Sequence, residues 1–245
     1  MKPRPSFPAS LARTAPPRHV VPAAVTDSGA QRRKLAARLA GQGIADRQVL
    51  AAIAAIERHR FVDSALGLQA YEDTSLPIGM GQTISKPGVV ARMLELLCRG
   101  GASRLGRVLE IGTGCGYQAA VLSLIATEVY SIERLRALHE KARANLRHLR
   151  LANVHLLFGD GIQGYAKGAP YAAIIAAAGG ATVPQAWIEQ LAVGGRLVAP
   201  VSSAQSGNHP GSGQQALLVI DRTANGVQQS VFESVQFVPL KSGVA

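Results

Sequence analysis

Residues 108–118 read VLEIGTGCGYQ, which predicts a buried strand, a glycine loop and the start of a helix. Glycine lacks a Cβ atom, so it permits positive φ and the close approach of a ligand to the backbone. The helix expected to open at Tyr117 presents free N–H groups in its first turn. The glycines stand at every second position, at Gly112, Gly114 and Gly116. This spacing differs from the dinucleotide fingerprint G-x-G-x-x-G, which needs a glycine where the chain has Tyr117.

The acid in this strand, Glu110, and the G-x-G-x-G loop after it resemble instead the S-adenosylmethionine loop of Rossmann-like methyltransferases. On that resemblance we predict that Glu110 and the three glycines contact S-adenosylmethionine as cofactor. The alternative is an ordinary strand–turn–helix in which the glycines serve packing alone.

From this strand onward, strands alternate with helices, which predicts an α/β fold with a mostly parallel sheet and helices on both faces. The expected strands cover 107–111, 128–132, 154–158, 172–177 and 195–201, and the expected helices cover 117–126, 135–149 and 183–191. Residues 202–214 are rich in Ser and Gly and predict a flexible loop. Two last strands, at 215–221 and 231–239, are expected to form an antiparallel pair at the end of the sheet.

The sequence ahead of the glycine loop predicts three helices and one irregular segment. A short helix is expected over 31–39, and Asp46 is a suitable N-cap for a second helix. Residues 71–86, YEDTSLPIGMGQTISK, predict a structured loop or short strand. Pro87 then suits the first turn of a third helix.

The net charge of +11 is concentrated at the N-terminus. Residues 1–34 hold seven Lys or Arg and one acid, and six of the 13 prolines lie before residue 23. This composition predicts a disordered basic, Pro-rich tail over 1–30 and one folded domain over 31–245. Three explanations stay open for the tail: weak binding to acidic surfaces, a targeting extension, or a misplaced start codon.

Several classes of protein are not expected from the composition. No apolar run approaches the roughly 20 residues that span a bilayer, and the N-terminus has no signal-peptide core. The two cysteines, Cys98 and Cys115, form neither a disulfide framework nor a metal-binding spacing. We therefore expect a cytoplasmic protein without a metal site or membrane partner. Cys115 is interpreted as a small residue that fills the glycine turn, with a catalytic cysteine as the alternative.

Ligands of open parallel sheets bind at the carboxyl ends of the strands, where two further acids are expected. Glu133 follows Gly116 by 17 residues and ends a strand, so its carboxylate can accept hydrogen bonds from ribose hydroxyls. Its alternative role is to cap the following helix. Asp160 and Gly161 end the next strand and are predicted to contact the adenine, with a plain Asp-Gly turn as the alternative.

Five blocks resemble the protein-L-isoaspartate O-methyltransferase family in the order in which they occur. The blocks are LPIGMGQTISKP (76–87), VLEIGTGCGYQ (108–118), FGDGIQGY (158–165), VPQAWIEQLAVGGRLVAPV (183–201) and FVPL (237–240). The resemblance covers roughly residues 31–240, and the GQTIS segment is its most specific part. It implies methyl transfer from S-adenosylmethionine to the free carboxylate of L-isoaspartyl residues in damaged proteins, which begins their repair. The implied partners are isoaspartyl proteins and peptides.

The same resemblance assigns residues to the substrate site. The catalytic serine of the family maps onto Ser85, and Thr83 can supply a second hydroxyl donor. Gln82 and Ile84 are expected to line the same pocket. The FVPL segment, with Val238 and Pro239, matches a segment of the family that lies beside the bound peptide. The alternatives are that Ser85 only caps a helix and that FVPL is an edge strand ended by its proline.

The chain departs from the family at the fourth strand, where Ala172 replaces the usual aspartate and Gly179-Gly180 predicts a looser segment. Two other functions therefore stay open. One is a methyltransferase of the same fold that acts on another carboxylate or on RNA, and the other is a cofactor-binding protein with reduced activity. Only 4% of the chain is aromatic and the cleft motifs hold few basic residues, so we expect no stable nucleic-acid partner. We also expect a monomer.

Overall fold

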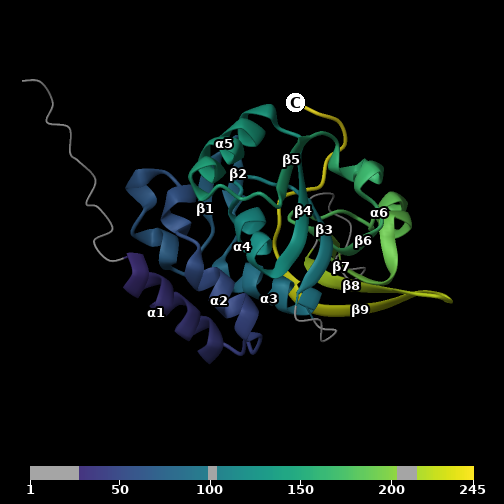
Figure 1. Ribbon diagram of the computed structural model, residues 1–245, viewed down its shortest axis with the longest axis horizontal. Helices are drawn as coiled ribbons and strands as arrows, with labels where there is room; N and C mark the ends of the chain where they lie inside the picture. The colour runs from purple at the N-terminus through teal and green to yellow at the C-terminus, as the bar shows by residue number, and fades with distance from the viewer. Residues whose placement is uncertain (1–27, 99–103, 203–213) are drawn as a thin grey trace, which may run out of the picture.

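The computed structural model describes residues 28–98, 104–202 and 214–245 (Figure 1). The predicted basic tail therefore lies outside the described residues up to residue 27, as does most of the predicted loop at 202–214. The helices are α1 (Ser28–Gly41), α2 (Arg47–Ala55), α3 (Pro87–Cys98), α4 (Tyr117–Ile125), α5 (Arg136–Leu146) and α6 (Gln185–Gln190). The strands are β1 (Leu76–Gly79), β2 (Gln82–Ile84), β3 (Leu105–Ile111), β4 (Ala126–Glu133), β5 (Val154–Phe158), β6 (Tyr171–Ala176), β7 (Leu191–Ser202), β8 (Gln215–Thr223) and β9 (Gly226–Val235).

The main sheet confirms the predicted fold class. Within the described residues, its strands lie in the order β5-β4-β3-β6-β7-β8-β9. Strands β3 to β7 are parallel, while β8 is antiparallel to both β7 and β9. The order reverses between β3 and β6, so these two strands open a crevice at their carboxyl ends. The fold thus places a ligand site just beyond the glycine loop.

The bounds predicted for the last strand were wrong. Strand β9 begins at Gly226, which already pairs with Thr223, and it ends at Val235. The chain reverses in a tight turn, so pairing starts earlier than the sequence pattern indicated. Pro239 has no N–H to donate to a ladder and makes only an isolated bridge to Gly179. Residues after β9 are therefore free to leave the sheet edge and cross toward the crevice.

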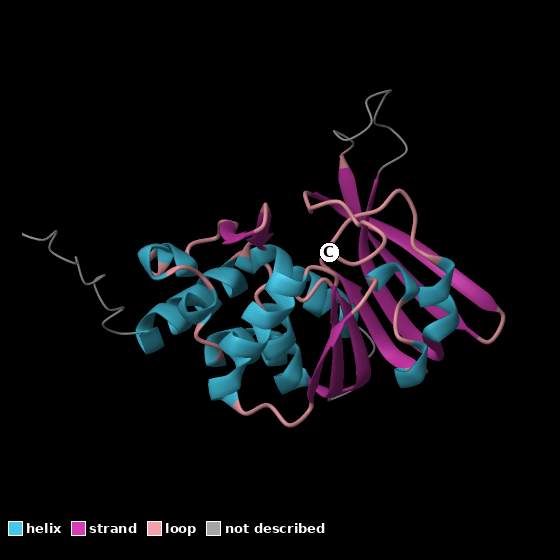
Figure 2. Ribbon diagram, turned by 90° about the horizontal axis from the view of Figure 1, so that it is seen from above, coloured by secondary structure: helices cyan, strands magenta, loops and turns pink. Residues whose placement is uncertain are grey.

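Apolar side chains on both faces of the sheet form two buried clusters. In one cluster, helices α1 through α5 pack against the face of the sheet that carries Val108 and Val129. The other joins the indole of Trp187 on α6 to the face that carries Leu109 and Ile174. Figure 2 shows most of the helical residues on one side of the sheet. No helix within the described ranges is long and apolar enough to cross a membrane.

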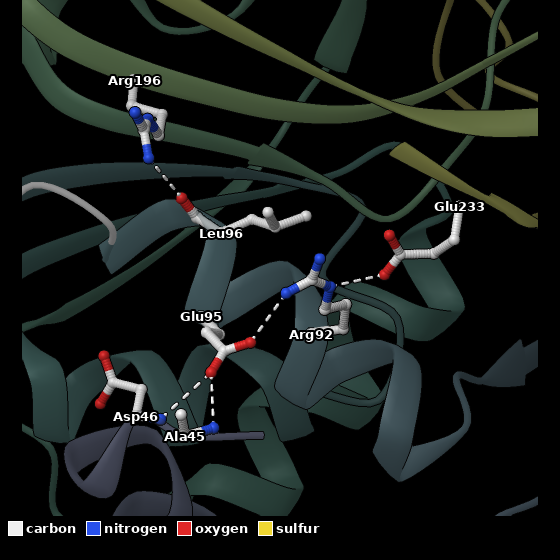
Figure 3. A network of polar contacts seen from close by, with 7 residues as sticks. All are labelled: Ala45, Asp46, Arg92, Glu95, Leu96, Arg196 and Glu233. Atoms are coloured by element: carbon white, nitrogen blue, oxygen red, sulfur yellow. Dashed lines mark hydrogen bonds and ion pairs between the residues drawn. The ribbon is translucent and has the colours of Figure 1, made fainter. Parts of the chain in front are cut away.

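A buried carboxylate on α3 joins three parts of the fold (Figure 3). Glu95 Oε1 accepts hydrogen bonds from the N–H groups of Ala45 and Asp46, at 2.7 and 3.1 Å. Its Oε2 accepts from Arg92 at 2.9 Å, and Arg92 also pairs with Glu233 on β9. Asp46 in turn caps α2, as predicted, by accepting from two N–H groups of its first turn. Glu95 therefore couples the start of α2 to α3 and to the sheet edge.

The protonation of Glu95 follows from this setting. Burial alone would raise the pKa of Glu95, but the Ala45 N–H and the Arg92 guanidinium hold it below its ordinary value of 4.5. The folded state therefore binds the ionised form more tightly than the unfolded chain does. This contribution to stability is present above pH 4.5 and is lost as the pH falls through the lower, folded-state pKa.

We predict that Glu95→Gln lowers the free energy of unfolding by about 1.5–3 kcal/mol at neutral pH, because hydrogen bonds to a buried charge are lost. Urea titration measures this difference, which should shrink as the pH falls below 4.5. The control is Glu233→Gln, at the other side chain that pairs with Arg92. Its side chain is 44% exposed against 6% for Glu95, so the loss should stay below about 1 kcal/mol. Equal losses in the two variants would contradict the account.

Candidate active site

A cavity of about 470 Å³ lies at the carboxyl ends of β3 and β4. The glycine loop and the end of β4 form its base. The hairpin of β1 and β2 forms one wall, and residues 238–241 form another. This size is within the range of ligand pockets, and the position is the one expected for an open α/β sheet.

Two of the three loop glycines line this cavity. Gly112 and Gly114 have φ of +89° and +56°, in the region that favours glycine, and both border the open space. Gly116 also has positive φ, but a Cβ atom there would lie 3.1 Å from Leu146 and 3.3 Å from Ala142. Gly116 does not line the cavity, so the structure does not support its predicted contact with the cofactor. Its missing side chain makes room for α5.

Glu133 holds the glycine loop in place. Its Oε2 accepts from the Gly114 N–H at 2.8 Å and its Oε1 accepts from the Leu135 N–H at 2.9 Å. The carboxylate therefore bonds the backbone just before α5, which is the capping role considered as the alternative. It also lines the cavity. Each carboxylate oxygen can accept a second hydrogen bond, so both oxygens retain capacity for ligand hydroxyls.

Glu110 lies beneath the loop, outside the residues that line the cavity. It is fully buried, and its Oε2 accepts from the Ser131 hydroxyl, which also contacts Thr113 in the loop at 2.6 Å. Burial raises the pKa of Glu110 to about 8, so its neutral form dominates at pH 7. The predicted contact between Glu110 and the cofactor is therefore not supported. Its hydrogen bonds instead support the loop from within the sheet.

Asp160 is likewise turned away from the cavity. Its Oδ1 accepts from the Ile162 N–H at 2.9 Å and its Oδ2 from the Gly243 N–H at 2.7 Å. These bonds match the Asp-Gly turn considered as the alternative, and the adenine contact stays a prediction. Gly161 does line the cavity. A Cβ atom there would come within 2.6 Å of Ile111, so the site requires glycine for packing.

The hairpin brings the predicted substrate residues together. Gln82, Thr83, Ile84 and Ser85 all line the cavity, with Thr83 exposed and Ser85 half-buried. The segment expected to be a loop or short strand is thus a two-stranded hairpin, in which Pro77 pairs with Thr83. It brings two hydroxyl groups to the same cavity as the glycine loop.

The opposite wall contains Val238 and Pro239, as predicted. The Gly179 N–H donates to the Val238 carbonyl at 2.9 Å, and the Leu240 N–H donates back to the Gly179 carbonyl at 2.8 Å. Gly180 is held in the same way between the carbonyl of Pro200 and the N–H of Ser202. The expectation that the two glycines make this segment looser was wrong, because backbone hydrogen bonds fix it on both sides.

Two residues that the sequence analysis did not assign to the site also line the cavity. Gln118 and Tyr117 stand in the first turn of α4 and are 8% and 2% exposed. Among the described residues, neither Gln118 Nε2 nor Tyr117 Oη has a hydrogen-bond partner. Unpaired buried polar atoms are costly, and a polar ligand in the cavity can satisfy them. The position directly after the third loop glycine was the signal that could have found them.

Comparison with known proteins identifies the family. A model of the protein-L-isoaspartate(D-aspartate) O-methyltransferase family matches residues 30–245. The chain belongs to this family. Similar proteins include a protein-L-isoaspartate O-methyltransferase of Leptothrix cholodnii, 54% identical over 99% of this chain and 85% of that protein. Another, from Methylibium petroleiphilum, is 56% identical over 98% of this chain and 88% of that protein.

Solved structures of the family share the fold. One protein-L-isoaspartate O-methyltransferase is 29% identical, with a TM-score of 0.75 over 87% of this chain and 67% of that one. A Plasmodium falciparum structure, in complex with S-adenosyl-L-homocysteine, is 22% identical, with a TM-score of 0.72 over 86% of this chain and 98% of that one.

We predict that Glu133→Gln weakens binding of S-adenosylhomocysteine to this methyltransferase roughly tenfold to 100-fold, because charge-assisted hydrogen bonds are lost. Isothermal titration calorimetry measures the dissociation constant. The control is Glu128→Gln on the same strand, whose carboxylate pairs with Arg107 and His155 instead. It should bind as the wild type does. Unchanged affinity in a folded Glu133→Gln protein would contradict the assignment.

Proposed function

We propose that this family member uses the cavity to transfer a methyl group from S-adenosylmethionine to the free carboxylate of L-isoaspartyl residues in damaged proteins. One observation carries the proposal: the cofactor elements and the GQTIS hairpin line the same space. Gly112, Gly114 and Glu133 are on one side, and Thr83 and Ser85 are on the other. Donor and acceptor can therefore be held together, as a single displacement requires.

The lining residues suit a reaction that needs positioning more than proton transfer. S-adenosylmethionine supplies an electrophilic methyl group when bound. The acceptor carboxyl has an ordinary pKa near ~4, so it is already ionised at neutral pH and needs no base. Glu133 is the one acid among the described residues that line the cavity, and each of its oxygens accepts a hydrogen bond from a backbone N–H. The protein therefore acts by orienting the acceptor and excluding water.

Ser85 is assigned as the residue that orients the acceptor, with Thr83 beside it. The helix-cap alternative loses support, because Asp73 accepts from the Gly88 N–H at 2.7 Å in the first turn of α3. Within the described ranges the Ser85 hydroxyl has no partner, so it can donate to the acceptor carboxylate. Gln82, Ile84, Val238 and Pro239 lie around it and are proposed to contact the peptide chain of the substrate.

We predict that Ser85→Ala slows single-turnover methyl transfer tenfold to 100-fold, since one neutral donor contributes about 1–3 kcal/mol. Its melting temperature and its affinity for S-adenosylhomocysteine should stay at the wild-type values. The matched control is Asp73→Ala, which removes the group that caps α3. That variant should lose about 1 kcal/mol of stability and keep its rate. A full rate with a lowered melting temperature in Ser85→Ala would assign capping to Ser85 instead.

The acceptor class is tested by direct comparison of substrates. Radiolabelled methyl transfer should occur to an isoaspartyl peptide and not to its normal aspartyl twin. Transfer to RNA or to a small carboxylic acid would favour the alternative acceptors, and binding of cofactor without any transfer would favour the reduced-activity alternative.

We further infer a cytoplasmic monomer without a nucleic-acid partner. Of the described residues that line the cavity, only Arg134 and Lys241 are basic and only Tyr117 is aromatic, which does not suit RNA. Cys98 and Cys115 are both free thiols, which is usual in a reducing compartment. Sedimentation equilibrium tests the monomer.

A further inference from the structure

A fully buried arginine lies behind the proposed acceptor site. Arg58, in the short helix Arg58–Phe61, is 0% exposed. Its Nε donates to the Ala70 carbonyl at 2.8 Å and its Nη2 donates to the Ser85 carbonyl at 2.7 Å. The guanidinium carbon lies 4.7 Å from the centroid of the Tyr117 ring. Arg58 thus contacts one residue of the hairpin wall and one residue of the cavity base.

The charge of Arg58 interacts electrostatically with Tyr117, Cys115 and Asp73 but is not paired directly with a carboxylate. Within the described residues, none of the ion pairs includes Arg58, and its Nη1 has no hydrogen-bond partner. Burial lowers the pKa of Arg58 below its ordinary value, but an arginine keeps its proton in proteins. Burying an unpaired cation is costly, and an apolar side chain of similar volume is often the more stable choice. Arg58 lies directly behind Ser85, so its positive charge can act on an anion bound next to Ser85.

We propose that Arg58 is a positioning residue for the acceptor: it fixes the backbone of Ser85 and supplies a buried positive charge that favours an anionic carboxylate in the cavity. This inference rests on the role proposed for Ser85. The Tyr117 ring lies against the guanidinium and lines the cavity, so a protein side chain rather than the protein surface stands between the charge and the cavity. In such a setting electrostatic attraction is stronger than in water.

Other cations also lie near the cavity, and one of them, Lys241, lines it and is exposed. Arg134 donates to the Gly243 carbonyl at 2.9 Å. Lys141 on α5 donates to the Ile78 carbonyl at 2.7 Å and so holds the first strand of the hairpin. Arg58 differs from Arg134 and Lys141 because its guanidinium contacts the residue that carries the proposed acceptor hydroxyl.

Two substitutions separate the hydrogen bond that fixes the Ser85 backbone from the positive charge of Arg58. Arg58→Lys keeps a charge but cannot donate to two carbonyls in the planar geometry of a guanidinium. We expect its kcat to fall about fivefold to tenfold while the KM for an isoaspartyl peptide stays within about twofold. Arg58→Met also removes the charge, so its KM should rise by a further factor of about five or more. The affinity of both variants for S-adenosylhomocysteine should match the wild type.

The control is Arg38→Met, which removes another arginine of the N-terminal helices that donates to a backbone carbonyl, that of Tyr71. It should change melting temperature without changing kcat or KM. A double-mutant cycle completes the test: in a Ser85→Ala background, Arg58→Lys should lower kcat by less than it does alone.

The proposal is overturned if Arg58→Lys, the milder change, has wild-type kcat, or if it lowers kcat equally with and without Ser85. It is also overturned if Arg58→Met, when folded, keeps the KM of Arg58→Lys. Wild-type activity in Ser85→Ala with a raised KM in Arg58→Met would remove the role of Ser85 and leave the charge effect of Arg58. The two proposals can therefore fail separately.

Discussion

The carboxylate of Glu133 is the contact on which the site depends. It accepts one N–H from the glycine loop and one from the start of the segment that leads into α5, so it fixes the loop relative to the ends of β3 and β4. The loop glycines have no side chains to hold them, and Thr113 supplies the loop's side-chain hydrogen bond to Ser131. Without the Glu133 anchor, neither the base of the cavity nor its distance from the hairpin would be defined.

The walls of the cavity come from segments far apart in the chain. The hairpin precedes the sheet in sequence, and residues 238–241 follow its last strand. Backbone hydrogen bonds through Gly179 join the second wall to the end of β6, and a Cβ atom at Gly179 would lie 2.5 Å from Gln215. Ala172 likewise fits a crowded place, since a Cβ atom at Gly106 would come within 2.9 Å of its methyl group. Gly179 and Ala172, which depart from the family pattern, therefore both stand where neighbouring atoms leave little room for a larger side chain.

The sequence pattern predicted the α/β order, the cap at Asp46 and the glycine-loop and Glu133 part of the cavity, because these depend on local periodicity and on strand ends meeting at one edge. The hairpin and residues 238–239 were predicted from the family resemblance. The structure adds constraints that the sequence did not show where distant elements meet. Gly116 is required by α5, and the extent of β9 is set by pairing with β8. Arg58 gave no signal at all, because a basic residue in an arginine-rich segment is usually exposed. Burial is a property of the assembled fold.

The central claim is that one cavity holds methyl donor and acceptor between the glycine loop and the hairpin. A crystal structure with S-adenosylhomocysteine and an isoaspartyl peptide tests it most directly. The account predicts ribose hydroxyls on the Glu133 carboxylate and the isoaspartyl carboxylate within hydrogen-bond distance of the Ser85 hydroxyl. A peptide bound away from the hairpin and residues 238–241, or a ribose without contact to Glu133, would contradict it.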